Sequence, residues 1–131
     1  MPAHAFSELL PAVIRPSYER ADDRGLFWEL LNSGQWCSVV HGKMKPNAVM
    51  GNHYHERTEV FFFLLTGRAQ VICADPKTKH QAELTLQARE GLIFKRNIAH
   101  AIRFQEESLF LMLKSEPYQP EDPDTFAYSV L

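Results

Sequence analysis

From Leu26 onward, the chain consists of short apolar or alternating runs that are separated by turn residues. The runs include QWCSVVHG (35–42), EVFFFLLTG (59–67), RAQVICA (68–74) and SLFLMLK (108–114). Runs of this kind, spaced about 8–12 residues apart, are typical of the strands of a β-sandwich or barrel. The pattern therefore predicts an all-β fold of about eight strands.

The segments on either side of this region have a different character. A chain of 131 residues suits a single domain, with an arm at about 1–21, a barrel at about 22–115 and a tail at about 116–131. In the arm, SELLPAVI (7–14) predicts a short helix or turn that its proline limits, and SYERADDRG (17–25) predicts a polar loop. The tail is acidic and rich in proline, and we expect it to lie in an ordered form across the body or a partner.

The run EVFFFLL (59–65) is apolar at both alternating positions. A strand with one solvated face would alternate between apolar and polar residues. Either both faces of this strand are covered within one chain, or one face packs on a second subunit. The second option predicts a homodimer.

Composition narrows the class of protein. The formal net charge is −2 without a basic cluster, so nucleic acid is not an expected partner. No apolar run approaches the roughly 20 residues of a membrane-spanning helix, and the start of the chain lacks the features of a signal peptide. We therefore expect a cytoplasmic protein without membrane contact. Two cysteines, Cys37 and Cys73, form no disulfide framework, and we expect buried free thiols.

Two histidines and a carboxylate lie close together in GNHYHERTE (51–59). If one strand continues through this segment, His53, His55 and Glu59 share a parity and point to the same face. Their nitrogen and oxygen atoms suit a divalent first-row metal ion. His100 is the fourth candidate ligand, because a neighbouring antiparallel strand would bring it alongside in a barrel with a small cavity. The alternative is a half-exposed strand whose polar residues face water.

These residues resemble the two metal-binding motifs of the cupin superfamily. After its His-x-His and Glu, the first motif closes with a glycine, here Gly67, and the second runs from Gly91 to a histidine. Asn47 and Asn97 stand at positions that are usually glycine, and asparagine tolerates the positive φ of such turns. The interval between Glu59 and Gly67 is one residue longer than in the usual motif, which predicts a β-bulge. The resemblance implies a double-stranded β-helix, the cupin jelly-roll barrel. It also implies that the metal is bound by His53, His55, Glu59 and His100.

A closer resemblance is to cupins that modify sugar nucleotides. DDRGLFWELL (22–31) is similar to a segment of nucleotide-sugar epimerases and ketoisomerases. GNHYH (51–55) and PEDPDTFAYSV (120–130) are similar to the C-terminal cupin of a bifunctional capsular polysaccharide enzyme. The resemblance implies zinc as the metal, with iron, manganese or nickel as alternatives. It also implies a nucleotide-linked keto sugar that is isomerised, epimerised or dehydrated in cell-surface polysaccharide synthesis. Any reduction would then need another protein.

One position departs from those relatives. Met50 stands where they carry an arginine that can hold a phosphate or an acidic group. If this chain binds the same class of substrate, another cation must replace that arginine. Arg24, Arg57 and Arg103 are the candidates. A bidentate arginine suits phosphate, but Arg24 can equally pair with an aspartate of its own loop.

The implied chemistry begins with the removal of a proton next to a carbonyl. The base must reach that proton and titrate near neutral pH, while a metal can stabilise the oxyanion that develops. A histidine bound to metal cannot accept a proton with the same lone pair, so Glu29, His41 and Tyr54 are the candidate bases, together with a metal-bound hydroxide. Two other functions stay open, since one fold hosts many: another metal-dependent cupin enzyme, such as a phosphosugar isomerase or a dioxygenase, and a non-catalytic small-molecule-binding cupin.

Overall fold

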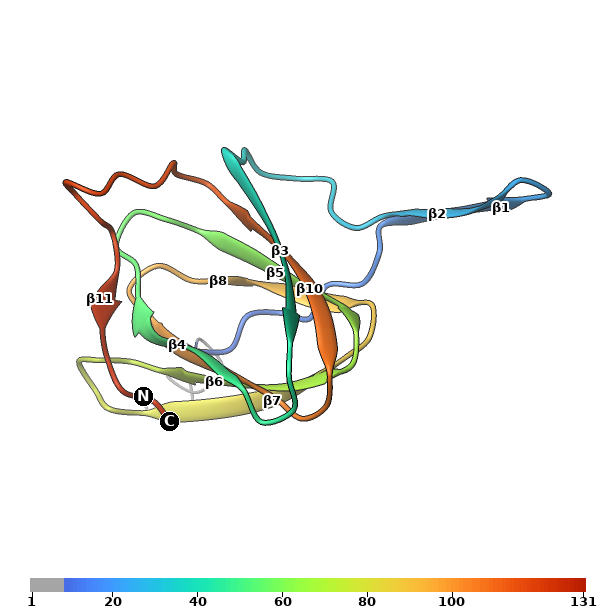
Figure 1. Ribbon diagram of the computed structural model, residues 1–131. Helices are drawn as coiled ribbons and strands as arrows, with labels where there is room; N and C mark the ends of the chain where they lie inside the picture. Colours follow the sequence, from blue (N-terminus) through green and yellow to red (C-terminus); the bar gives the residue numbers. More distant parts are fainter. Residues whose placement is uncertain (1–8) are drawn as a thin grey trace.

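The computed structural model describes residues 9–131, which form strands joined by turns (Figure 1). In chain order the strands of this region are β1 (Tyr18–Asp22), β2 (Gly25–Glu29), β3 (Ser38–Met44), β4 (Val49–Tyr54), β5 (Val60–Thr66), β6 (Arg68–Ala74), β7 (Gln81–Gln87), β8 (Glu90–Phe94), β9 (Ala99–Phe104), β10 (Ser108–Lys114) and β11 (Phe126–Ala127). The prediction of an all-β chain is confirmed. Over the same residues, no helix is long and apolar enough to cross a membrane.

Strands β3 to β11 form two antiparallel sheets that face each other (Figure 1). One sheet has the order β3-β10-β5-β8, and the other has the order β11-β4-β9-β6-β7. Apart from β6 and β7, consecutive strands from β3 to β10 lie in opposite sheets, so the chain winds around one core. This is the jelly-roll arrangement, and the predicted double-stranded β-helix is confirmed.

The apolar core lies between the two sheets. Alternate residues of the central strands point inward, as expected for sheets with one buried face. The core includes Val60, Phe62, Leu64, Val71, Cys73, Ile102, Phe104 and Phe110. Cys73 is a buried free thiol, as expected, whereas Cys37 is free but exposed, so the expectation of a buried thiol was wrong there. Aliphatic and aromatic side chains together therefore fill the space between the two sheets.

Strand β5 carries the run that is apolar on both faces. Phe62 points into the core, while Phe61 and Phe63 point to the opposite face, and all three are at most 2% exposed. Trp36 packs on Phe61 with ring centroids 6.4 Å apart. The chain itself therefore covers both faces of β5. The homodimer stays a prediction, but this run no longer supports it.

Residues 18–29 form an antiparallel hairpin; β1 lies where the sequence predicted a polar loop, whereas β2 lies in the strand-like part of the chain that begins near Leu26. The hairpin extends away from the two sheets (Figure 1), and nearly all of its residues are exposed. Tyr18 and Phe27 are diagonal neighbours on the two strands, with ring centroids 6.2 Å apart. The prediction was wrong because cross-strand pairs of this kind stabilise a hairpin even where charged residues conceal its alternation.

The arm before the hairpin lies along one sheet edge. The helix or turn predicted for 7–14 falls partly on residues 7 and 8, which lie outside the described residues. From Leu10 to Ile14 the backbone is not helical. Instead, Ile14 and Gly91 exchange two backbone hydrogen bonds of 2.7 and 2.8 Å. The arm thus covers part of the edge strand β8.

The turns predicted to replace motif glycines form as expected. Asn47 has a φ of 70° and Asn97 a φ of 65°, which lie in the left-handed region that asparagine tolerates. The predicted bulge is also present. In the pairing of β5 with β10, Leu109 lies opposite Thr66 and Phe110 opposite Leu64, so Leu65 is the extra residue.

The C-terminal tail lies across the body of the protein, as predicted (Figure 1). Its strand β11 pairs with the edge strand β4, with Phe126 opposite Tyr54. Those two rings stack at 5.3 Å. Further along, the backbone N–H groups of Val130 and Leu131 donate to the side-chain oxygen of Asn52. The tail therefore contacts the strand that carries the His-x-His motif.

Candidate functional site

A β-bulge in β4 sets the direction of the first histidine. Gly51 lies opposite Ala101 of β9, but the next aligned pair is His53 with His100. Asn52 is the extra residue, and both Gly51 and Asn52 have positive φ, 97° and 59°. Residues directly opposite each other on antiparallel strands point to the same face. The bulge therefore aims His53 and His100 at the same side of the sheet.

Three of the four predicted ligands come together at the end of the barrel. The ring centroid of His53 lies 4.8 Å from that of His55 and 4.9 Å from that of His100, and the centroids of His55 and His100 lie 5.7 Å apart. Each residue offers one ligand atom such that these atoms lie within 4.8 Å of one another. His53 and His55 are partly buried, and His100 is buried. This group could hold a metal ion.

The histidines line a mainly apolar cavity of about 100 Å³, here called the inner cavity. Its apolar wall consists of Met50, Val60, Phe94, Ile102 and Met112. Thr125 of the tail and Lys114, the last residue of β10, complete the lining. A site with few polar groups and apolar walls is typical of small-molecule binding.

The environment keeps two of the histidines neutral. Burial lowers the pKa of His100 to about 3, and the neighbouring His53 and His55 act in the same direction. Burial, followed by the charges of His55 and Lys114, lowers the pKa of His53 to about 4. Neutral imidazole is the form that binds metal.

His100 also has an unpaired ring nitrogen. Its Nδ1 is buried without a hydrogen-bond partner among residues 9–131, and its ring stacks on Phe94 at 3.9 Å. A buried polar atom without a partner costs free energy, and coordination of a cation would satisfy it. The donor set, the neutral rings and this nitrogen all fit a first-row metal.

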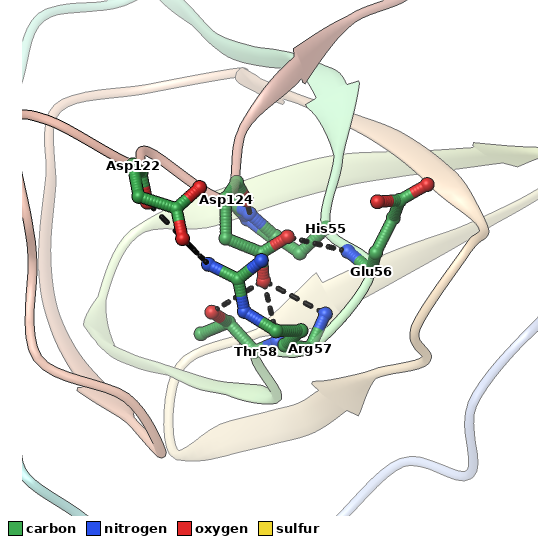
Figure 2. Close-up of polar contacts among 6 residues, drawn as sticks. All are labelled: His55, Glu56, Arg57, Thr58, Asp122 and Asp124. Atoms are coloured by element: carbon green, nitrogen blue, oxygen red, sulfur yellow. Dashed lines mark hydrogen bonds and ion pairs between the residues drawn. The ribbon is translucent and has the colours of Figure 1, made fainter.

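His55 is oriented by the C-terminal tail (Figure 2). Its Nδ1 lies 2.6 Å from the backbone oxygen of Asp124. A carbonyl oxygen only accepts hydrogen bonds, so Nδ1 carries the proton and Nε2 keeps a free lone pair. Metal-binding histidines commonly have such a partner for the second nitrogen.

The Asp124 side chain holds the turn that follows His55. Its carboxylate accepts hydrogen bonds from the backbone N–H groups of Glu56, Arg57 and Thr58 and from the Thr58 hydroxyl, at 2.7–2.9 Å (Figure 2). Burial acts to raise the pKa of Asp124, but these hydrogen bonds outweigh it and lower the pKa to about 2. Asp124 is therefore ionised at neutral pH and fixes both the turn and the imidazole.

Glu59 is not part of the histidine group. Strand β4 ends at Tyr54, so the continuous strand that was predicted to align Glu59 with the histidines does not exist. After His55 the chain instead forms a turn, which is held by hydrogen bonds to the Asp124 carboxylate. The Glu59 carboxylate lies 3.6 Å from the Arg96 guanidinium and is 44% exposed.

The three candidate bases do not line the inner cavity. Glu29 lies on the exposed hairpin, where its carboxylate accepts a hydrogen bond from Ser17. His41 is exposed on β3. Tyr54 stacks on Phe126 and lines a separate groove with Asn97.

The candidate arginines are spread over the molecule. Arg24 forms an ion pair of 2.6 Å with Asp22 in the hairpin turn, which is the alternative that the sequence left open. Arg103 is exposed on β9, next to the inward-pointing Ile102. Arg57 lies closer to the histidines, 3.4 Å from Asp122 of the tail.

A second cavity of about 180 Å³, here called the outer cavity, adjoins the inner one. The two share His55, Lys114 and Thr125 as lining residues. Arg57 and Tyr118 also line the outer cavity. Sequence reasoning missed Lys114, whose only signal was a charge at the end of an apolar run. It also missed Asp124, although the tail had been recognised as part of the resemblance.

Comparisons with known proteins show which proteins the chain is similar to in sequence and in fold. The chain is 26% identical over 125 residues to the spore coat polysaccharide biosynthesis protein SpsL of Bacillus subtilis (strain 168), covering 85% of this chain and 83% of that protein. The fold is similar to the capsular polysaccharide assembling protein CapF of Staphylococcus aureus, with a TM-score of 0.68 and 22% identity. That match covers 86% of this chain but only 34% of CapF, so the chain spans about a third of that protein.

The fold is also similar to dTDP-4-dehydrorhamnose 3,5-epimerase from Sulfolobus tokodaii, with a TM-score of 0.70 and 19% identity. This match covers 83% of the chain and 72% of the epimerase. The resemblance to sugar-nucleotide-modifying cupins is thus confirmed. The family model described as "Polysaccharide biosynthesis C-terminal domain" matches residues 20–126. By this match over most of its length, the chain belongs to the polysaccharide biosynthesis C-terminal domain family.

Proposed function

We propose that this protein is a metal-binding cupin enzyme that removes a proton next to the carbonyl of a nucleotide-linked keto sugar during polysaccharide synthesis. The observation that carries the proposal is the group of three histidines in the inner cavity. The names of an epimerase of similar fold and of a spore coat polysaccharide protein support the substrate class.

The three histidines are the proposed metal ligands, with zinc as the expected ion. A bound divalent ion would supply a Lewis acid that polarises the sugar carbonyl. The protein supplies the rest: apolar side chains limit the access of water, Asp124 fixes the tautomer of His55, and burial keeps His53 and His100 neutral. Glu59 is not needed for this ligand set.

The proposed step conserves atoms and charge. The C–H bond next to the carbonyl breaks, and its electron pair forms a carbon–carbon double bond while the carbonyl oxygen becomes an enolate oxygen. The proton passes to a basic atom facing the cavity. None of Glu29, His41 and Tyr54 lines that cavity, and a neutral imidazole that binds metal through one nitrogen carries a proton on the other, so the acceptor is a basic group other than the three histidines. Return of the proton to a different face or atom gives epimerisation or isomerisation.

Deuterium exchange tests the proposal directly. The protein is incubated in D₂O with dTDP- and UDP-linked 4-keto-6-deoxyhexoses, and NMR follows deuterium at the carbons next to the carbonyl. We expect incorporation with wild-type protein and its loss in His53→Gln and His100→Gln. His41→Gln, which changes an exposed histidine outside the cavity, is the matched control. Absence of exchange with every keto sugar would contradict the proposal.

Metal analysis separates the proposal from the alternative enzyme class. We expect close to one zinc per chain in protein purified without added metal. Iron together with oxygen uptake would favour a dioxygenase instead. Zinc without exchange would favour a non-catalytic binding cupin.

A further inference from the structure

Among lysine, arginine, aspartate and glutamate side chains, Lys114 alone lines the inner cavity as the described residues form it. The other lining groups are apolar residues, a glycine, a threonine and the three histidines, two of which burial keeps neutral. Over the described part of the chain, no carboxylate lies within ion-pair distance of its ammonium group. Placing a cation beside apolar walls without a counter-ion costs free energy, so the cavity favours a ligand that brings a negative charge.

The position of Lys114 suits a ligand whose negatively charged group lies between a part in the inner cavity and a part in the outer cavity. Lys114 lines both the inner and the outer cavity and therefore lies where they join. The inner cavity ends in the histidines, whereas the outer cavity is more polar and has the exposed ring of Tyr118 at its wall. Three carboxylates also line the outer cavity: Asp124 accepts from the turn after His55, Asp122 pairs with Arg57, and Glu116 lies two residues after Lys114.

Lys114 thus lies between a mainly apolar cavity that ends in the histidines and a more polar cavity with an aromatic ring. From this arrangement, and resting on the proposed function, we propose that Lys114 binds the diphosphate of a nucleotide-linked sugar. The sugar then lies in the inner cavity against the histidines, and the nucleoside lies in the outer cavity beside Tyr118. An ammonium group is a common partner of phosphate, and an aromatic ring offers a base a face for stacking. Lys114 thus takes the role for which Arg24, Arg57 and Arg103 were the candidates from sequence.

Binding measurements with stable probes test this subsite. Isothermal titration calorimetry compares dTDP, UDP, thymidine, uridine and inorganic pyrophosphate on wild-type protein, Lys114→Met and Lys114→Arg. A charge-assisted contact corresponds to roughly a tenfold to hundredfold change in Kd, and we expect that loss for the diphosphates in Lys114→Met. Lys114→Arg should retain most of the affinity. Lys43→Met, which removes an exposed lysine of β3 near Glu107, should bind as wild type.

The outcomes separate this inference from the proposed function. Wild-type affinity of Lys114→Met for dTDP and UDP would overturn the subsite, as would failure of the wild-type protein to bind either nucleotide. Unchanged nucleotide affinity with slower deuterium exchange would show that the ammonium acts on the sugar carbonyl and would also overturn it. Diphosphate binding that depends on Lys114, without any exchange, would keep the subsite and reject the proposed reaction. Thermal unfolding of each variant verifies folding, and Lys114→Gln provides a second neutral variant.

Discussion

Replacement of Asp124 by alanine should loosen the His55 turn while the barrel stays folded. Four donors of the turn bond to the Asp124 carboxylate, and each charge-assisted hydrogen bond contributes about 1.5–3 kcal/mol in isolation. These contributions are not additive, because the freed N–H groups of a surface turn can bind water. We expect Asp124→Ala to lower the free energy of unfolding by about 2–4 kcal/mol.

The pKa of Asp124 provides a second estimate of how much its carboxylate contributes to the free energy of unfolding. The pKa of Asp124 falls from the ordinary 3.8 to about 2 in the folded protein, which corresponds to at most about 2.4 kcal/mol at neutral pH. Solvent screening at this partly exposed site reduces it to about 1–2 kcal/mol. Because the folded pKa is the lower one, this stability is present above about pH 4 and is lost as pH falls toward 2.

The assay is urea unfolding of metal-free protein at pH 7 and at several values down to pH 2.5. The matched control is Asp122→Ala, which removes a neighbouring tail carboxylate whose partner, Arg57, is half exposed. A surface pair of this kind contributes about 0–1 kcal/mol. Metal affinity, measured by competition with a coloured chelator, should fall roughly tenfold to hundredfold in Asp124→Ala, because the loosened turn no longer holds His55 against the backbone oxygen of residue 124 that orients its ring. Equal stability and equal metal affinity of the two variants would refute the reasoning.

Three further predictions concern the histidines, the bulge and the assembly. His53→Ala and His100→Ala should lose most bound metal in elemental analysis, whereas Glu59→Ala should keep it, and metal loss in Glu59→Ala would return that residue to the ligand set. Gly51→Ala should destabilise the fold by about 2–4 kcal/mol, because a Cβ there would lie 2.6 Å from the His100 carbonyl oxygen at a φ of +97°; a melting temperature within a degree of wild type would contradict this. Analytical ultracentrifugation should give the mass of a homodimer, and a monomer would disprove that prediction.

Much of the barrel was predictable because its strands are short, apolar and separated by clear turns. The positive φ at Asn47 and Asn97 and the bulge at Leu65 also followed from local reasoning. Strand β1 of the hairpin did not, since its charged residues conceal its pairing with β2. The covering of Phe61 by Trp36 could not be predicted either, because it depends on contacts distant along the chain.

The site was predictable only in part for a related reason. Parity along a strand predicted that His53, His55 and Glu59 lie together; the two histidines do, but Glu59 does not, because the strand ends before the turn that bonds to Asp124. That contact joins residues 66 positions apart, so no local pattern reveals it. His100 was identified through its motif. Lys114 carries no motif, and only the position of the end of β10 beside the cavity identifies it.

The tail makes the site the last part of the molecule to be completed. The strands that carry His53 and His100 leave the ribosome before residues 122–128, so during synthesis a barrel can collapse while the imidazole of His55 still lacks its partner. A nascent or truncated chain would then show a normal β-sheet signal and still bind metal weakly. Secondary structure alone is therefore an insufficient measure of correctly matured protein.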